Sequence, residues 1–375
     1  MFEHSVRSGA RLLRCGYTTG TCAALAASGA ARLLLTGEAP ERVRLVTPKG
    51  WPVEVPLAEA VLAGDEARCA VRKDAGDDPD VTDGCLVFAS ARRTERGVTV
   101  DGGAGVGRVT KPGLDQPVGA AAINSVPRRM IREAVEAVCE ELGYGCGLAI
   151  VISVPGGEEL ARRTFNPQLG IEGGLSILGS SGVVEPMSER ALVDTVELAL
   201  SQARALGEKR VILTPGSYGA AYLRRLGLDA CGVATVKCSN FIGDALDAAT
   251  AAGFEEVLLV GHIGKLVKLA GGVMNTHSKQ ADCRAELFTA HAAICGAEPA
   301  LCRELMEAAT ADACLALLER AGLKEPVLAS LLAAIQRQLT RRAGDRMRAG
   351  AVLFSNQYGG LGETAEAERL RREWA

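Results

Sequence analysis

Apolar and polar residues follow two different patterns along the chain. In the first half, short apolar runs with strand-like spacing are separated by turns, and two longer stretches repeat apolar residues at helical spacing. The predicted helices cover residues 19–35 and 127–142, and the predicted strands lie in RVRLVTP, WPVEVPL, RCAVRK, CLVFAS, GVTV and LAIVISV. This order of elements predicts an N-terminal α+β domain over residues 1–185, built on a largely antiparallel sheet.

From residue 186 onward, helical and strand patterns alternate. The alternating segments are MSERALVDTVELALSQARALG, RVILT, a short helix ending at Gly227, VATVK, FIGDALDAATAAG and EVLLVG. Alternation of this kind implies right-handed crossovers between parallel strands. We therefore predict a two-domain protein whose C-terminal domain, residues 186–375, is an α/β Rossmann-like, doubly wound domain. A helical region follows from residue 281, then a last strand, AVLFS, and a charged, solvated C-terminal helix or tail.

Composition narrows the class of protein. The chain has 375 residues, with 48% hydrophobic, 23% charged and 4% aromatic residues and a net charge of −3. This balance gives no basic surface or stacking platform for nucleic acid. No signal peptide is evident, and no apolar run reaches the roughly 20 residues that cross a bilayer. We expect a cytoplasmic protein without a nucleic-acid or membrane partner, and a homo-oligomer stays open.

The twelve cysteines do not predict a metal site. They are spread along the chain without a C-x-x-C pair, which zinc sites and dithiol chemistry typically use. Buried free thiols explain them better, and no metal is expected.

Three loops at the ends of predicted strands are candidates for ligand binding, because α/β sheets bind ligands at the carboxyl ends of their strands. The loops are TPGSYG, KCSNFIGD and GHIGK. Small residues let a ligand approach the backbone, and helix N-termini offer N–H groups to anions. Each loop alone is also explained by helix caps and tight turns, but together they predict an anion-tolerant crevice. Its candidate residues are Thr214, Gly216, Ser217, Lys237, Ser239, Asn240, Gly261 and Gly264.

Histidines and lysines of this half could handle protons or carboxylates. His262 follows a predicted strand, which favours a polar or proton-handling role over a place in the core. His277 follows a Gly-Gly turn and is a second candidate. Lys265 and Lys268 are three residues apart on one helical face, where they could receive two carboxylates or form a solvated edge.

The first half contains a glycine-rich loop, DGGAGVG. Its residues Asp101, Gly103, Gly105 and Gly107 match the acidic-glycine loop of many Rossmann-type methyltransferases by letters. In those proteins a helix begins directly after the loop, but here Pro112 would interrupt it. A glycine-rich turn or hairpin is therefore an equally good interpretation.

An acidic run, KDAGDDPDVTDG, does not have the spacing of an EF-hand calcium loop. Its aspartates are expected to bond their own backbone or to pair with cationic groups. The cations nearest to predicted strand and helix ends in this half would suit a polyanionic ligand or only solubility. They are Arg108, Lys111, Arg128 and Arg129.

The first helix begins at GYTTGTCAA, which carries more hydroxyl groups than one helix cap requires. Thr18, Thr19 or Thr21 can cap the helix, leaving the other hydroxyls unexplained. We interpret the stretch as a grip on a ligand carboxylate, with a purely structural role as the alternative.

Eight long motifs in one order, between residues 14 and 278, resemble the CbiD family of cobalt-precorrin-5B C1-methyltransferases. They are GYTTGTCAA, KDAGDDPDVTDG, GVGRVTKPGLDQPVGAAAIN, VPRRMI, SVPGGEELARRTFNPQLGIEGGLSILGSSGVVEPMS, TPGSYG, KCSNFIGD and GHIGKLVKLAGGVMNTHS. The resemblance implies an enzyme of anaerobic cobalamin synthesis. It would move a methyl group from S-adenosylmethionine to carbon 1 of cobalt-precorrin-5B, giving cobalt-precorrin-6A.

The resemblance gives the candidate residues their roles. We expect His262 or Asp244 to assist proton movement, and cationic and hydroxyl groups to hold the carboxylates of the corrinoid substrate. S-adenosylmethionine is expected in the crevice of the second domain, at Thr214, Gly216, Ser217, Gly261 and Gly264, rather than at Asp101–Gly107. The expected substrate contacts are Thr18, Thr19, Thr21, Arg108, Lys111, Arg128, Arg129, Lys237, Ser239, Asn240, Lys265 and His277.

Two other functions stay open at this point. An NAD(P)-dependent oxidoreductase is disfavoured, because no G-x-G-x-x-G lies between a strand and a helix. A non-catalytic corrinoid carrier would need the same anion-binding cleft without the chemistry.

Overall fold

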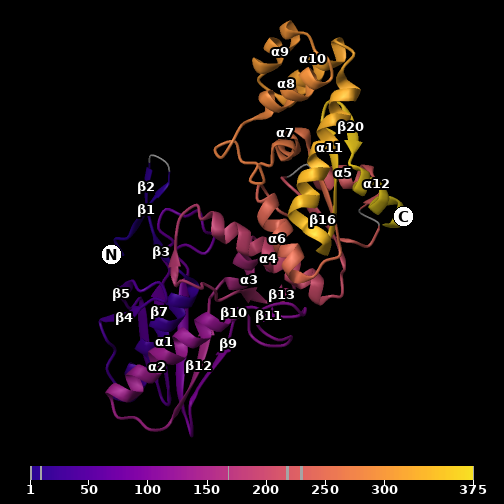
Figure 1. The fold of residues 1–375 in the computed structure, drawn as a ribbon. Helices are drawn as coiled ribbons and strands as arrows, with labels where there is room; N and C mark the ends of the chain where they lie inside the picture. The colour runs from indigo at the N-terminus through magenta and orange to yellow at the C-terminus, as the bar shows by residue number, and fades with distance from the viewer. Residues whose placement is uncertain (1, 9–10, 168, 217–218, 229–230, 375) are drawn as a thin grey trace. The chain divides into compact units, whose positions relative to one another are not determined.

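The structure is a computed structural model that describes residues 2–8, 11–167, 169–216, 219–228 and 231–374. The chain folds as two compact units, Met1–Glu189 and Arg190–Ala375 (Figure 1). The helices of the described residues include none that is both long and apolar enough to cross a membrane.

Unit 1 is built on a mixed sheet in the strand order β6-β7-β8-β12-β9. Its strands are β6 (Glu59–Ala63), β7 (Glu66–Arg72), β8 (Leu86–Thr94), β12 (Gly147–Ser153) and β9 (Val98–Gly102). Neighbouring strands are antiparallel except β12 and β9, which are parallel.

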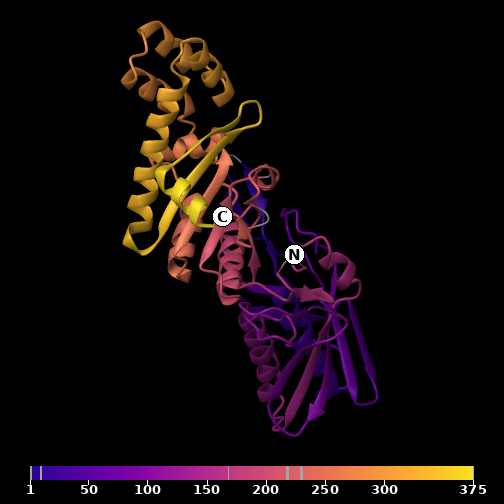
Figure 2. The same ribbon diagram turned by 90° about the vertical axis from the view of Figure 1, so that its right-hand side faces the viewer.

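Two long helices, α1 (Thr19–Thr36) and α2 (Ser125–Glu141), pack against each other and on this sheet. They run beside its strands, as Figure 2 shows. The alanine run of α1 is wholly buried, because small side chains let the helix lie close to the sheet and to α2.

Short strand pairs and one helix complete unit 1. They are β1 (Ser5–Ser8) with β2 (Arg11–Arg14), β3 (Gly16–Tyr17) with β15 (Val183–Val184), β4 (Arg42–Val46) with β5 (Pro52–Pro56), β10 (Gly105–Val106) with β14 (Gly174–Leu175), β11 (Arg108–Val109) with β13 (Ile171–Glu172), and helix α3 (Gly157–Ala161). The pair β3 and β15 matters most for the site, because it holds residues 176–184 against the first turn of α1.

Unit 2 contains, in its described part, a sheet in the order β17-β16-β18-β19-β20. The strands are β16 (Arg210–Thr214), β17 (Ala234–Lys237), β18 (Glu256–His262), β19 (Arg348–Ser355) and β20 (Gly359–Glu363). The first four are parallel, and β20 is antiparallel to β19. The helices are α4 (Glu189–Ala205), α5 (Gly219–Arg225), α6 (Ile242–Ala252), α7 (Ile263–Leu266), η2 (Val267–Gly271), α8 (Arg284–Ile294), α9 (Pro299–Met306), α10 (Ala311–Arg320), α11 (Lys324–Ala343), η3 (Gly344–Arg346) and α12 (Ala365–Trp374).

The prediction of a Rossmann-like domain for residues 186–375 is wrong. A Rossmann sheet has the order 3-2-1-4-5-6, whereas this sheet ends in an antiparallel strand and has a different order. The alternation that suggested the fold extends only from β16 to β18. Helices α8 to α11 then separate β18 from β19, so the second half of a Rossmann fold has no counterpart in this segment.

The C-terminal segment was expected to be a solvated helix or tail, and this expectation is also wrong. Helix α12 packs on β19, and it buries Ala367, Leu370 and Trp374. These residues lie three and four positions apart, so one apolar stripe of an otherwise charged helix faces the sheet.

Candidate active site

The three predicted strand-end loops of unit 2 do lie together. Strands β17, β16 and β18 are neighbours, so their carboxyl ends share one edge of the sheet. The N–H of Cys238 donates to the Thr214 carbonyl at 3.1 Å, which joins the loops after β16 and β17. The N–H of Thr276 donates to the Asn240 carbonyl at 2.9 Å, which adds the segment of His277 to the cluster.

Glycines of these loops make room for the protein's own side chains. A Cβ on Gly261 would lie 2.8 Å from Cγ of Pro215, and a Cβ on Gly216 would lie 3.2 Å from Nζ of Lys265. Gly264 faces the ring of His262. Close packing therefore explains these glycines without a ligand, and the predicted Ser217 lies outside the described residues.

Two lysines in this cluster differ in how their ammonium groups are bonded. Lys268 is 2% exposed and donates to the carbonyls of Ala281 and Thr276 at 2.7 and 3.3 Å. It holds the segment that carries His277. Lys265 is half-buried, and the described residues give its Nζ no hydrogen-bond acceptor. Burial lowers the pKa of Lys265, and the nearby charges of Lys237 and Lys268 add to this effect.

The remaining polar groups of the crevice are more open. Lys237 is exposed at the end of β17, and Ser239 has a φ of 53°, in the left-handed region. Asp244 lies exposed in the first turn of α6. His277 is half-buried, and its Nδ1 accepts the N–H of Lys279 at 3.1 Å. These groups are free to meet a ligand at the strand ends.

His262 ends β18 and caps α7. Its Nδ1 accepts the N–H of Gly264 at 3.1 Å, and its Nε2 lies 3.4 Å from the backbone nitrogen of Asn356. The ring also meets Phe354 edge-on, with centroids 5.7 Å apart. Burial lowers the pKa of His262, and the charge of Asp312 opposes this effect. The imidazole is therefore held neutral, and its Nδ1 lone pair accepts the N–H of Gly264 in the first turn of α7.

In unit 1, the threonines of GYTTGTCAA bond to the protein itself. Thr18 Oγ1 accepts the N–H of Thr21 at 3.2 Å, and so caps α1. Thr21 Oγ1 donates to the Gly182 carbonyl at 2.6 Å, and Thr19 Oγ1 accepts the N–H of Leu178 at 3.0 Å. The additional hydroxyls thus fasten residues 178–182 to the start of the helix, and the structure gives the threonines these local roles.

A small cavity lies beside this helix start, with a volume of about 150 Å³. It holds a charge pair of the kind expected for the acidic run, although the sequence analysis did not single out its lysine: Lys73, 2% exposed, donates to Asp80 Oδ2 at 2.6 Å. Asp80 Oδ1 accepts from both the N–H and the hydroxyl of Thr82, at 2.8 and 2.6 Å. The cavity is lined by Thr18, Thr19, Lys73, Asp80, Val81, Thr82, Thr164, Asn166, Leu175, Ser176, Leu178 and Val184.

The two charges of this cavity stabilise each other. Burial raises the pKa of Asp80, but the Lys73 charge and the Thr82 hydrogen bonds outweigh burial and hold the pKa below its usual range. Asp80 is therefore ionised at neutral pH. A sequence signal for the pair did exist, since Lys73 ends the predicted strand RCAVRK and heads the acidic run.

The four cations predicted to hold substrate in unit 1 are not equivalent. Arg128 donates to the carbonyls of Val100, Ile123 and Ala121 at 2.7, 2.8 and 3.1 Å, so its guanidinium is occupied by the protein. The neighbouring Arg129 is exposed and only approaches Glu133, at 3.7 Å.

Arg108 and Lys111 complete this set. Arg108 pairs with Asp101 at 3.1 Å and donates to the Gly102 carbonyl at 3.0 Å. The aliphatic part of the Lys111 side chain packs along Gly170, and Lys111 as a whole is exposed. Of the four cations, Lys111 is the one that a ligand could reach without breaking a hydrogen bond or ion pair of the described residues, and Arg129 would give up only its exposed contact with Glu133.

The glycine-rich loop at Asp101–Gly107 forms no cradle that opens a helix. It runs from the end of β9 through the short strand β10, and two of its glycines face backbone at close range. A Cβ on Gly105 would lie 1.9 Å from the Val154 carbonyl oxygen, and one on Gly107 would lie 2.8 Å from the Gly174 carbonyl oxygen. A Cβ on Gly103 would lie 2.5 Å from the side-chain Oγ of Ser153. These glycines are required for close packing of chain segments.

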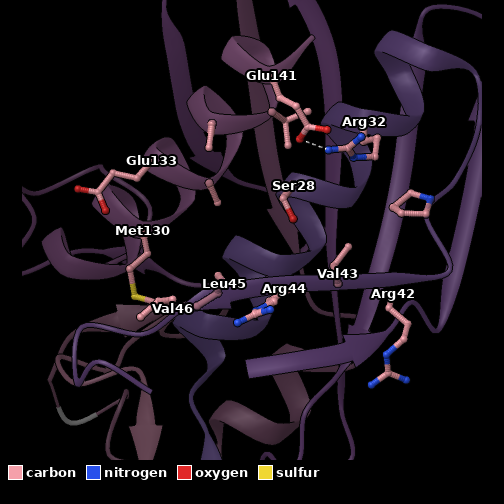
Figure 3. A pocket seen from close by; sticks show the side chains of 14 residues that line it. Ser28, Arg32, Arg42, Val43, Arg44, Leu45, Val46, Met130, Glu133 and Glu141 are labelled. Carbon is pink, nitrogen blue, oxygen red and sulfur yellow. Dashed lines mark hydrogen bonds and ion pairs between the residues drawn. The ribbon is translucent and has the colours of Figure 1, made fainter. Parts of the chain in front are cut away.

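A second hollow of unit 1, about 460 Å³, lies between α1, α2 and β4 (Figure 3). Arg32 and Glu141 form an ion pair across it. Another arginine that lines it, Arg42, is paired with Glu54 at 2.9 Å. None of the predicted site residues lines this hollow, and we assign it no role in the site.

Comparison with known families identifies the class of protein. The CbiD family model matches residues 6–186, and the model of the CbiD C-terminal domain matches residues 275–365. The chain belongs to the CbiD family.

Two relatives of this chain share the name cobalt-precorrin-5B C(1)-methyltransferase. The protein of that name from Ruminiclostridium cellulolyticum is 45% identical over 95% of this chain and 92% of its own length. The one from Moorella thermoacetica is 42% identical over 96% of this chain and 98% of its own length.

Among solved structures, the chain is similar to the cobalamin biosynthesis protein CbiD from Archaeoglobus fulgidus. The identity is 30% and the TM-score is 0.40, with 74% of this chain and 86% of that chain covered.

Proposed function

We propose that this protein methylates carbon 1 of cobalt-precorrin-5B and gives cobalt-precorrin-6A, a step of anaerobic cobalamin synthesis. The observation that carries the proposal is the 45% identity to a cobalt-precorrin-5B C(1)-methyltransferase over 95% of this chain. Both CbiD family models match as well, one in each unit. The enzyme is therefore a methyltransferase, and the oxidoreductase alternative is dropped.

The methyl donor that we propose is S-adenosylmethionine. It supplies a methyl group on a sulfonium, so the C–S electron pair stays on sulfur in S-adenosylhomocysteine while carbon 1 supplies the pair of the new C–C bond. No protein nucleophile is needed for such a displacement, and positioning of the two reactants dominates catalysis. Carbon 1 becomes nucleophilic when the macrocycle loses a proton, so one general base helps.

His262 and Asp244 are the two residues that we propose for this proton. His262 is neutral at physiological pH, because burial lowers its pKa. To accept a proton at Nδ1, it must release the N–H of Gly264. Asp244 needs no such rearrangement, since it lies exposed in the first turn of α6. Single-turnover methylation by His262→Ala and Asp244→Asn separates the two, and the base is the residue whose loss slows the rate.

The substrate is a broad macrocycle rimmed with carboxylates, which calls for several cations. Lys265 and Lys237 suit this role, because the first lies half-buried at the strand ends of unit 2 and the second is exposed there. Ser239, Asn240 and His277 stay predicted contacts at the same edge. We do not propose Arg128 as a substrate contact, because its guanidinium already donates hydrogen bonds to three carbonyls.

The experiment that tests the proposed function uses cobalt-precorrin-5B and S-adenosylmethionine labelled in its methyl group. We expect one labelled methyl per corrinoid and an equal amount of S-adenosylhomocysteine. A non-catalytic carrier would bind the corrinoid and transfer no label, and that result would overturn the proposal.

A further inference from the structure

In the cavity, Lys73 has hydrogen-bond donors that are not used, and Asp80 has an acceptor site that is not used. An ammonium has three N–H donors, and the described residues offer Lys73 Nζ one acceptor, Asp80 Oδ2. Its other two donors therefore have no partner among them, although the side chain is 2% exposed. A carboxylate accepts about four hydrogen bonds, and Asp80 has three from Lys73 and Thr82. Buried charges with unused hydrogen-bonding groups are costly unless water or a ligand meets them.

The size and lining of the cavity limit what can enter. Sites that enclose a whole small molecule measure about 300–1,000 Å³, whereas this cavity measures about 150 Å³. It can take one end of a larger ligand. Leu175, Leu178 and Val184 give one part of its wall apolar character, and the charge pair gives another part polar character. A short aliphatic chain that ends in charged groups suits this wall.

The charges of the cavity favour a zwitterionic ligand over a ligand that carries only a carboxylate. Lys73 and Asp80 neutralise each other, and the same loop carries Asp74, which is paired with Arg14, and Asp77, Asp78 and Asp83 as well. A lone carboxylate arm would meet the negative charge of Asp80 beside Lys73, which disfavours it. An α-amino acid brings one charge of each sign, so its carboxylate can meet Lys73 while its ammonium meets Asp80. A further positive charge on the ligand is attracted by the excess of aspartates.

We propose that this cavity binds the methionyl end of S-adenosylmethionine, with the α-carboxylate on Lys73 and the α-ammonium on Asp80. The inference rests on the proposed function for the identity of the donor, and it moves the methionyl end from the strand ends of unit 2 to unit 1. Of the threonines of GYTTGTCAA, Thr18 and Thr19 line the cavity, and Thr19 and Thr21 position its neighbouring segment. They hold residues 178–182 on the start of α1 and so build one wall of the cavity.

Isothermal titration calorimetry with two ligands tests the assignment of the charges. S-adenosylmethionine has both charged groups, and decarboxylated S-adenosylmethionine keeps the amine but lacks the carboxylate. Losing one hydrogen bond between charged groups costs about tenfold or more in affinity. We expect Lys73→Met to weaken S-adenosylmethionine by that factor and to leave the decarboxylated ligand within about twofold. We expect Asp80→Asn to weaken both ligands.

Two further variants keep the test decisive. Lys49→Met removes another lysine of unit 1, paired with Glu185, and we expect it to bind both ligands as the unaltered protein does. Val184→Phe fills the cavity without touching the charge pair. We expect it to weaken S-adenosylmethionine, and it replaces Lys73→Met as the deciding variant if the latter does not fold, as judged by circular dichroism.

The outcomes separate this inference from the proposed function. Unchanged affinity for S-adenosylmethionine in Lys73→Met or Val184→Phe overturns the inference, as does an equal loss for both ligands in Lys73→Met. The proposed function still stands when the inference fails, provided that the unaltered protein methylates cobalt-precorrin-5B. If the unaltered protein binds no S-adenosylmethionine, with or without cobalt-precorrin-5B, both are overturned.

Discussion

Arg128 and Arg129 are adjacent in sequence and were both predicted to hold substrate, yet the structure gives them different roles. Arg128 bridges the carbonyls of Val100, Ala121 and Ile123, and so ties α2 to β9 and to the segment before the helix. Arg129 is exposed on the same helix. We predict that Arg128→Met destabilises unit 1 and that Arg129→Met does not.

The magnitude follows from the hydrogen bonds. Each of the three carbonyls loses a charged donor, at about 1 kcal/mol per bond, so Arg128→Met lowers the free energy of unfolding by about 3 kcal/mol. For a unit of this size, roughly 2–4 °C of Tm corresponds to 1 kcal/mol, which gives a fall of about 6–12 °C. Arg129 makes only an exposed i,i+4 contact, at 3.7 Å, and its loss changes stability by less than about 0.5 kcal/mol.

The assay follows the unfolding of unit 1 alone. The chain has two tryptophans, Trp51 in unit 1 and Trp374 in unit 2, so a Trp374→Phe background leaves Trp51 fluorescence as the reporter in urea and thermal unfolding. Equal stability of the two arginine variants would refute this reasoning. Unchanged stability of Arg128→Met together with lost corrinoid affinity would return Arg128 to the substrate site.

Three more predictions follow from individual contacts. Thr21→Val removes the buried hydroxyl that donates to the Gly182 carbonyl, and we expect urea unfolding to show a loss of about 1–3 kcal/mol; no loss would mean that the hydroxyl serves a ligand instead. Leu370→Ala removes apolar contact on the face of α12 that packs on β19, and we expect calorimetry to show that the free energy of unfolding of unit 2 falls by about 2–4 kcal/mol. Arg369→Ala, on the exposed face of the same helix, is the control and should change it by less than about 0.5 kcal/mol. If His262 is the base, burial keeps it neutral to lower pH than an ordinary imidazole, so the single-turnover rate rises with pH through a midpoint below about 6.5 and then levels off; a midpoint above that value would point away from His262.

Features that depend on neighbours in sequence could be predicted well. The helix at residues 19–35 was predicted from its alanine run and its threonines, and the structure has it at Thr19–Thr36 with Thr18 as the cap. The loops after β16, β17 and β18 were expected to meet. The hydrogen bond of Cys238 joins the first two, and the close approach of Gly261 to Pro215 brings the third against them. In both cases the signal lies within a few residues, because capping and strand-end geometry are local.

Roles that depend on distant partners could not be predicted. Arg128 looks like a free cation in VPRRMI, because two of its three carbonyl partners come from residues 100 and 121. The sequence does not distinguish Lys73 from other cations near the acidic run, because only the folded chain reveals that its side chain is 2% exposed. The Rossmann prediction failed for a related reason, since the strand order is set by pairing over long distances, as between β18 and β19.

The stripe in α12 is a different case, because its signal was present in the sequence. Ala367, Leu370 and Trp374 recur at helical spacing within GETAEAERLRREWA. The surrounding charges concealed a stripe that is narrow but sufficient to pack on β19.

The central claim is that this protein forms the carbon–carbon bond at carbon 1 of the corrinoid. Carbon-13 nuclear magnetic resonance on the product made from cobalt-precorrin-5B and S-adenosylmethionine with a carbon-13 methyl group tests it most directly. The account predicts one enriched methyl signal coupled to carbon 1, together with one S-adenosylhomocysteine per product. A corrinoid recovered without enrichment, or enriched at another ring carbon, would contradict it.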